Sequence, residues 1–274
     1  MSLLNDAGEP RLLTSIADGI ASATINRPEA RNAMSSDVRE ALLAFLESLA
    51  DNSDVRVVLI QAAGKTFVAG GDIKAFGEGL AMTPEQRSAD MERRAAGAGR
   101  VNAVLASLPQ PVIVAARGYA VGVGASLLFA SDLAIVSETT KLGLTHVNLG
   151  INPDGAGTYF LPRQIGAKRA AQVALLGEMM DAAELLSLGL VNWVVPDDEL
   201  DGRALALAQK LAAGAPVAQQ ETKRLLQASL GNDIDAQVAA EAQSLGRCAL
   251  TDDYSEGLRA ILDRRAPVFG KQGN

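Results

Sequence analysis

The chain reads Lys65-Thr-Phe-Val-Ala-Gly-Gly-Asp-Ile-Lys74, separated by three residues from a continuous β-branched and aliphatic run that precedes it, residues 56–61. Such a run is typical of a strand that is buried on both faces. The segment Ala69-Gly70-Gly71 keeps side chains small where this strand ends, so backbone N–H groups there can approach a ligand closely. Asp72 fits the N-cap of a following helical turn. The stretch therefore predicts a turn whose backbone N–H groups can donate hydrogen bonds to an oxygen that becomes negative during a reaction.

A second glycine-rich turn, Gly118-Tyr-Ala-Val-Gly-Val-Gly124, follows another apolar run, residues 111–116. Two donor turns, each after a core strand, suggest that one oxyanion is held from two sides. A further strand is predicted at residues 133–136, after a helix that opens near Gly124. This alternation of strands and helices indicates parallel strands with helices outside them.

The rest of the chain divides into a mixed part and a helical part. In the mixed part, the pattern predicts a β-hairpin (12–16 and 20–25) and a helix that begins at Ser35 or Ser36 and ends near Asp51, followed later by a polar stretch (77–99). In the C-terminal part it predicts four helices, 203–213, 216–230, 233–248 and 253–263. Breaks between them are predicted at Gly214, Gly231 and Gly246. We interpret 77–99 as a mobile helical flap over the site or as a solvated surface helix. We expect an α/β core with the site in residues 1–200 and a helical region in residues 201–274.

Composition sets broad limits on function. Of the 274 residues, 48% are hydrophobic, which is ample for a sizeable core, and the net charge of −7 argues against nucleic acid and an anionic membrane as partners. The single cysteine, Cys248, excludes an internal disulfide and fits a reducing compartment. No signal pattern and no apolar run of about 18 residues is present. We expect a soluble, cytoplasmic protein.

Five motifs follow one another over nearly the whole chain: Ala23-Thr-Ile-Asn-Arg-Pro-Glu-Ala-Arg-Asn-Ala-Met34, Phe67-Val-Ala-Gly-Gly-Asp-Ile-Lys74, residues 118–124, Gly150-Ile-Asn-Pro-Asp-Gly-Ala-Gly-Thr158 and residues 255–269. In sequence and order they resemble the enoyl-CoA hydratase/isomerase (crotonase) family. The resemblance implies a crotonase-like spiral of β-β-α turns, with C-terminal helices that pack between the subunits of a trimer or of two stacked trimers. It also implies an acyl-CoA thioester substrate and fatty acid metabolism. It implies no metal and no separate cofactor, because coenzyme A is part of the substrate.

The resemblance assigns the two oxyanion donors to the backbone N–H groups of Gly71 and Val123. Position 123 is usually glycine in the family, but the donor is a backbone group, so valine need not abolish it. An oxygen held there acidifies the carbon next to the thioester carbonyl, because the charge of the enolate develops on that oxygen.

Both glutamates that the family's hydratases use to activate a water are replaced. Ser126 and His146 stand at the two matching positions. A serine is a poor general base by itself, so we do not expect hydration by the two-glutamate route. Ser126 is interpreted as a wall or hydrogen-bonding residue. His146 either donates to substrate, orients a water, tunes Asp154 or serves a structural role.

Asp154 remains as the nearby carboxylate, at a position where isomerising members and aryl-CoA dehalogenases of the family carry an acid. The dehalogenases use it as a nucleophile, but their aromatic partners are not found here. We therefore predict an acyl-CoA (enoyl-CoA) isomerase in which Asp154 moves the proton. Alternatives are a hydratase-type lyase that uses His146, a non-catalytic CoA-binding family member, and Asp154 as only a helix N-cap or turn residue.

Coenzyme A contacts also follow from the resemblance. Ala30 and Arg31 are expected near the adenine, Gly71 and Ile73 along the pantetheine arm, and Lys74 and Lys271 at phosphates, although these lysines also fit a solvated surface. The remaining predicted substrate-binding residues are Ala69, Gly70, Asp72, Tyr119, Gly122 and Ser126.

A competing interpretation treats Gly122-Val-Gly124 as a dinucleotide-binding turn, with Glu138 as a ribose ligand. The third glycine of that fingerprint is missing, and the first glycine comes late after its strand. We therefore do not favour a nicotinamide-dependent dehydrogenase.

Overall fold

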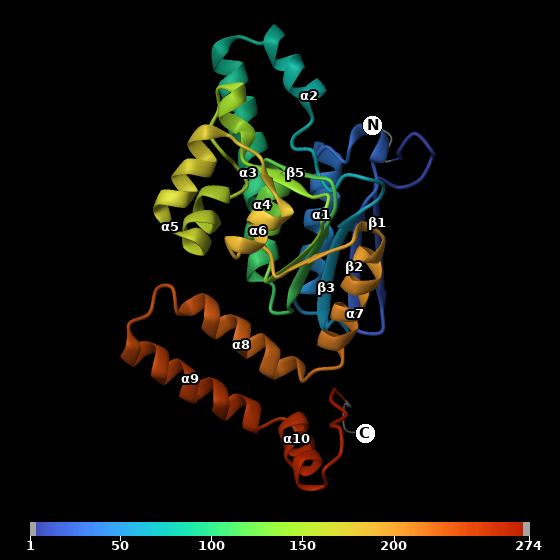
Figure 1. The fold of residues 1–274 in the computed structure, drawn as a ribbon, viewed down its shortest axis with the longest axis vertical. Coiled ribbons are helices and arrows are strands. Elements are labelled where there is room, and N and C mark those ends of the chain that lie inside the picture. Colours follow the sequence, from blue (N-terminus) through green and yellow to red (C-terminus); the bar gives the residue numbers. More distant parts are fainter. Residues whose placement is uncertain (1–3, 271–274) are drawn as a thin grey trace.

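A computed structural model describes residues 4–270 and is built on a six-stranded sheet (Figure 1). Its strand order is β1 (Leu12–Ala17), β2 (Ile20–Ile25), β3 (Val57–Ala62), β4 (Val112–Ala116), β6 (Leu133–Ser137) and β9 (Trp193–Val195). Strands β1 and β2 form the predicted antiparallel hairpin, and all other neighbours are parallel. The alternating pattern therefore predicted the parallel sheet correctly.

A second, three-stranded sheet consists of β5 (Tyr119–Val121), β7 (Lys141–Gly143) and β8 (Met180–Asp181). Strand β4 leads into β5 and then into α4 (Val123–Ala130). Strand β6 leads in the same way into β7 and then, through the short 3-10 helix η3 (Thr145–Leu149), towards α5 (Gly157–Leu176). Strands β4 and β6 thus each continue into a small-sheet strand before the helix, as expected for a spiral of β-β-α turns.

Helices cover both faces of the large sheet. Leu42 of α1 (Ser36–Leu49) and Leu105 of α3 (Pro84–Ser107) are fully buried in one cluster with Ile60 and Val114 of the sheet. On the other face, α7 (Leu200–Ala212) packs through small residues such as Ala204. Each buried leucine or isoleucine contributes about 1.5–3 kcal/mol. By packing, α7 therefore covers the sheet, although nearly all of it lies in the expected helical region, residues 201–274.

The polar stretch 77–99 is helical, but it does not form a separate flap. It contains the end of α2 (Ile73–Glu78), the 3-10 helix η2 (Gly79–Ala81) and most of α3. Thr83 and Gln86 form a reciprocal capping box where α3 begins. The later turns of the same helix are buried against α1, so α3 is anchored in the core.

The C-terminal helices α8 (Pro216–Ala228), α9 (Ile234–Ala249) and α10 (Asp252–Leu262) extend away from the sheets (Figure 1). The four predicted helices are present, but the predicted break at Gly246 is wrong because α9 continues through it. The remaining short elements are η1 (Pro28–Ala30), α6 (Ala182–Ser187) and η4 (Asp197–Glu199). Within residues 4–270, no helix combines the length and apolarity needed to cross a membrane.

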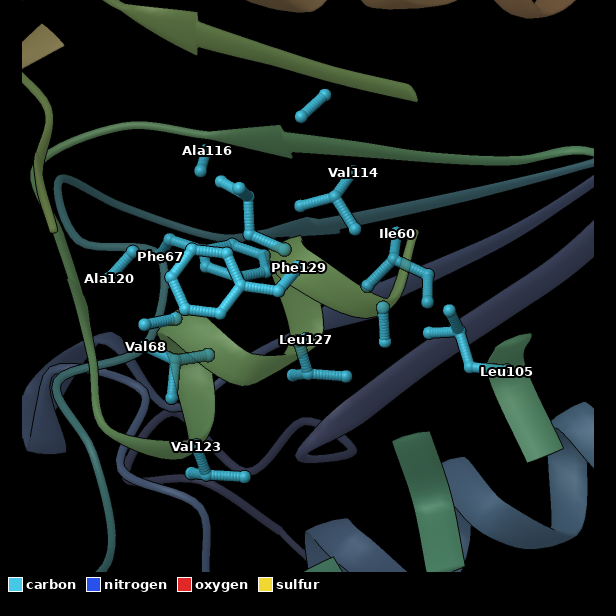
Figure 2. Packing of buried hydrophobic residues seen from close by; sticks show 14 of the residues in the cluster. Ile60, Phe67, Val68, Leu105, Val114, Ala116, Ala120, Val123, Leu127 and Phe129 are labelled. Carbon is cyan, nitrogen blue, oxygen red and sulfur yellow. The ribbon is translucent and has the colours of Figure 1, made fainter. Parts of the chain in front are cut away.

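Buried apolar side chains next to the two glycine turns anchor them to the core. Phe67 and Val68, just before the first turn, are fully buried in the cluster that contains Val123, Leu127 and Phe129 of α4 (Figure 2). The ends of the two turns are therefore held by a rigid core rather than by loops alone.

Candidate active site

The two glycine turns lie side by side because backbone hydrogen bonds join them. The N–H of Val68 donates to the carbonyl of Tyr119 (2.9 Å), and the N–H of Val121 donates to the carbonyl of Val68 (2.8 Å). Beyond these bonds the chains remain close, since a Cβ added to Gly122 would lie 3.8 Å from Cα of Gly70. Strand pairing thus brings two segments that are distant in sequence to one point.

A cavity of about 460 Å³ opens where the two turns meet, a size typical of small-molecule sites. Its wall includes Ala69-Gly70-Gly71 from the first turn and Val121-Gly122-Val123 from the second. His146 and Asp154 also line it. The residues that the sequence singles out for catalysis therefore share one cavity.

The backbone N–H groups of Gly71 and Val123 donate no hydrogen bond within residues 4–270. Val123 is the first residue of α4, so its N–H has no acceptor in a preceding helical turn. The ring of Phe76 packs against Gly71, where an added Cβ would stand 2.6 Å from the ring's Cζ. The cavity wall thus carries two backbone donors without protein acceptors.

A histidine and a carboxylate meet on another part of the cavity wall. Nε2 of His146 lies 3.2 Å from Oδ1 of Asp154. The His146 side chain is 9% exposed and that of Asp154 is 29% exposed. Nδ1 of His146 is buried and has no hydrogen-bond partner in the described part of the chain. Asp154 is therefore the more accessible member of the pair.

Two buried polar side chains hold the loop that carries Asp154. The hydroxyl of Ser126 donates to the backbone carbonyl of Asp154 (3.0 Å), and Nδ2 of Asn102 donates to the carbonyl of Gly155 (2.7 Å). Ser126 is fully buried and does not line the cavity. Its predicted role as a pocket wall is therefore corrected, because it supports the loop from behind.

Comparison with known proteins agrees with this geometry. Residues 15–272 match the family described as enoyl-CoA hydratase/isomerase. The chain belongs to the enoyl-CoA hydratase/isomerase family. The fold is crotonase-like, as expected, and membership in this enzyme family replaces the dinucleotide-binding interpretation of Gly122 and Gly124.

Relatives of this enoyl-CoA hydratase/isomerase family member carry names of both reaction types. It is 33% identical to a probable enoyl-CoA hydratase of Rhodobacter capsulatus (93% of this chain, 95% of the relative). It is 31% identical to 1,2-epoxyphenylacetyl-CoA isomerase of Escherichia coli (94% and 97%). The crystal structure of a putative enoyl-CoA hydratase/isomerase from Mycobacterium abscessus superposes with a TM-score of 0.91, at 31% identity, over 95% of this chain and all of that one. These names support the family and leave the reaction to be argued from the site.

The residues predicted to bind coenzyme A fall into two groups in this family member. Besides the glycine turns, Ile73 lines the cavity and is 59% exposed. Outside the lining, Arg31 lies beside the first turn, because its carbonyl accepts from the N–H of Ala69 (3.1 Å). Ala30 ends η1, Lys74 is exposed near the start of α2, and Tyr119 is half-exposed. Lys271 lies outside the described residues.

Asp72 was predicted both as an N-cap and as a substrate-binding residue. Its carboxylate accepts from the N–H groups of Lys74 (3.1 Å) and Ala75 (3.4 Å), and it pairs with Arg27 at 3.4 Å. The N-cap is confirmed. The side chain does not line the cavity, so its carboxylate is used to fix the start of α2.

One wall of the cavity was predicted only in part. The stretch 77–99, interpreted as a flap over the site or as a surface helix, contributes to it, whereas the contribution of α1 and of the segment before it was not predicted. This wall is formed by α1, α2 and α3 and the segment before α1, with Met34, Ser36, Arg39, Phe76, Ser88, Met91, Glu92, Arg94, Ala95 and Ala98. One signal was available in the sequence. Leu42, Leu46 and Leu49 recur at helical spacing on the buried face of α1, and Arg39 continues this series with a cation.

Proposed function

We propose that this chain is an acyl-CoA isomerase in which Asp154 moves a proton between two carbons of an enoyl thioester. The main support for this proposal is the contact between His146 and Asp154. A nitrogen of His146 is already engaged by the carboxylate, and its other ring nitrogen is buried. The substrate would thus meet Asp154, while His146 holds the carboxylate in place.

The proposed reaction needs one base and one anion site. Asp154 removes a proton from the carbon next to the thioester carbonyl, and the electron pair moves onto the carbonyl oxygen. The N–H groups of Gly71 and Val123 stabilise that oxygen. The carboxylic acid formed at Asp154 then returns the proton two carbons away as the double bond shifts. No atom is gained or lost, so no cofactor is required.

Hydration is the main alternative, because several relatives are named as hydratases. It would need another group to activate water, since Ser126 is buried and bonded to the Asp154 carbonyl. His146 would have to leave Asp154 to act as that base. A non-catalytic CoA-binding protein and a ring rearrangement instead of a double-bond shift also remain alternatives. We further propose a cytoplasmic enzyme that assembles as a trimer or as two stacked trimers.

The test compares the wild type with Asp154→Asn, which keeps the shape of the side chain and removes the base. Isomerisation of 3-enoyl-CoA substrates should fall by about 10²–10⁴-fold, with little change in acyl-CoA affinity. In deuterium oxide, wild type should exchange the proton next to the carbonyl and the variant should not. Equal exchange in both proteins would remove Asp154 from the mechanism. Strong crotonyl-CoA hydration that survives the substitution would make His146 the base.

A further inference from the structure

Arg39 is a cation without a protein partner on the wall of the cavity. Its side chain makes no hydrogen bond and no ion pair within residues 4–270. Arg39 is half-buried, and the lining of the same cavity includes Met34 before α1 and Met91, Ala95 and Ala98 of α3. A guanidinium has five N–H donors, and leaving it partly desolvated without an acceptor is costly.

The fold makes room for this guanidinium. Gly97 stands inside α3, where glycine is less favourable than alanine. A Cβ at that position would lie 2.7 Å from Nε and 3.0 Å from Cζ of Arg39. Arg39 therefore lies directly against α3 at Gly97, and in this conformation its guanidinium occupies the space that a larger side chain at position 97 would take.

The other charged groups on the cavity wall already have partners. Arg94 pairs with Asp90 and lies 5.6 Å from the ring centre of Phe76. Its hydrogen bond keeps the pKa of Asp90 below the ordinary value. Glu92 is exposed and accepts a 3.4 Å hydrogen bond from Ser88.

His146 and Asp154 complete the charged groups on the wall, and they engage each other. Among the cavity-lining residues that the structure describes, Arg39 is therefore the cation that remains for a ligand.

We propose that Arg39 binds an anionic group, a carboxylate, on the acyl chain of the substrate. This inference rests on the proposed acyl-CoA function and names the substrate class: enoyl-CoA thioesters of dicarboxylic acids. Planar guanidinium and carboxylate groups pair in a bidentate way, which suits a guanidinium that has no protein acceptor. The phosphates of coenzyme A are the other source of anions. The residues expected near that moiety, Arg31 and Lys74, lie outside the cavity lining, whereas Arg39 shares the cavity with Asp154.

Ligand affinities measured by titration calorimetry test this proposal without depending on catalytic turnover. The ligands are hexanedioyl-CoA and hexanoyl-CoA, which differ by a carboxylate in place of a methyl group, and free coenzyme A. Wild type should bind hexanedioyl-CoA at least about tenfold more tightly than hexanoyl-CoA. Arg39→Met should abolish that difference and leave the affinity for free coenzyme A unchanged, and Arg39→Lys should retain part of it. Arg93→Met is the matched control, because it removes the same charge from α3 at a residue that does not line the cavity. Arg93 pairs with Asp90, as Arg94 does.

Three outcomes would overturn the proposal. Wild type could bind both thioesters equally. Arg39→Met could weaken free coenzyme A as much as hexanedioyl-CoA, which would assign Arg39 to a phosphate. Arg93→Met could have the same effect as Arg39→Met, which would show that the change in affinity comes from the loss of one positive charge on the protein and not from a contact with Arg39. Thermal melting of each variant excludes misfolding as the cause. If the carboxylate preference is found but 3-enoyl thioesters are not isomerised, the isomerase proposal fails and this one stands.

Discussion

Nε2 of His146 lies 3.2 Å from Oδ1 of Asp154, whereas Nδ1 of the same ring is buried without a partner in residues 4–270. Asp154 is also the more exposed of the two side chains (29% against 9%). In the proposed mechanism, His146 therefore positions the carboxylate and Asp154 moves the proton.

His146→Gln tests that division. An amide keeps an N–H donor for the Asp154 carboxylate but cannot act as a base. We expect turnover to fall by less than about tenfold, in contrast to the 10²–10⁴-fold loss in Asp154→Asn. His146→Leu, which removes the donor, should be more damaging than His146→Gln. Steady-state rates of the three variants decide the matter. If His146→Gln is as inactive as Asp154→Asn, His146 takes part in proton transfer.

Val123→Pro tests the oxyanion donor without removing the helix. Proline is tolerated at the first helical position, where the N–H has no intrahelical acceptor. The substitution deletes the donor and should lower turnover by about 10²–10³-fold, equivalent to about 2.7–4 kcal/mol. Val123→Ala keeps the N–H and is the matched control. A proline variant as active as the alanine variant would exclude this N–H from catalysis.

Local patterns predicted most of the fold. Strand β3, strand β4 and the hairpin β1–β2 follow from aliphatic runs and from the turn at Asp18-Gly19, which are short-range signals. The family motifs placed Gly71, Val123, His146 and Asp154 in one site, and all four line one cavity. Their chemical roles stay predictions.

The α3 part of the cavity wall was anticipated through the stretch 77–99, but the α1 part was not. Whether Arg39 faces solvent or the cavity depends on how α3 packs against α1, which is a tertiary relationship between distant segments. Ser126 was misplaced for a related reason. Its family position is next to the active site, but its hydroxyl turns back to the carbonyl of Asp154. Sequence position fixes the backbone and not the direction of the side chain.

Two glycines should respond to alanine in opposite directions. Gly118 has a φ of +60°, and a Cβ there would lie 2.1 Å from the carbonyl oxygen of Lys65, so Gly118→Ala should destabilise the fold by at least about 3 kcal/mol. Gly99 lies within α3 with no atom near its Cβ position, so Gly99→Ala should stabilise by about 0.5–1 kcal/mol. Chemical denaturation measures both. A tolerated Gly118→Ala would contradict the close backbone crossing.

The C-terminal helices should mediate self-association. These helices and the turns between them expose many large apolar side chains: Leu226, Leu230, Ile234, Val238, Leu245, Leu250, Ile261 and Leu262. Exposed apolar side chains in such numbers favour burial against another chain. We expect light scattering at micromolar concentration to give three or six times the chain mass of 28.4 kDa. A monomer under those conditions would refute the trimer.

Lowering the pH should weaken the packing of α9 on α8, because an ion pair between the two helices is lost. The guanidinium of Arg247, with help from Arg224, lowers the pKa of Glu221 to about 2. Because an unfolded glutamate has a pKa of about 4.3, the ionised form is favoured by folding. The stabilisation is complete above that value and is lost as the pH falls towards about 2. The protection factors of the α9 amides, which are corrected for the intrinsic pH dependence of amide exchange, should therefore fall over this interval.

Glu221→Gln is the control for that measurement, since it cannot titrate and keeps the size of the side chain. The variant should exchange faster than wild type at pH 6, because Arg247 and Arg224 lose their charged acceptor. The difference between the two proteins should shrink as the pH approaches 2, where Glu221 of the wild type is half-protonated. Other carboxylates titrate equally in both proteins, so they cancel in the comparison. A difference that stays constant from pH 6 to pH 2 would show that this carboxylate does not join α8 to α9.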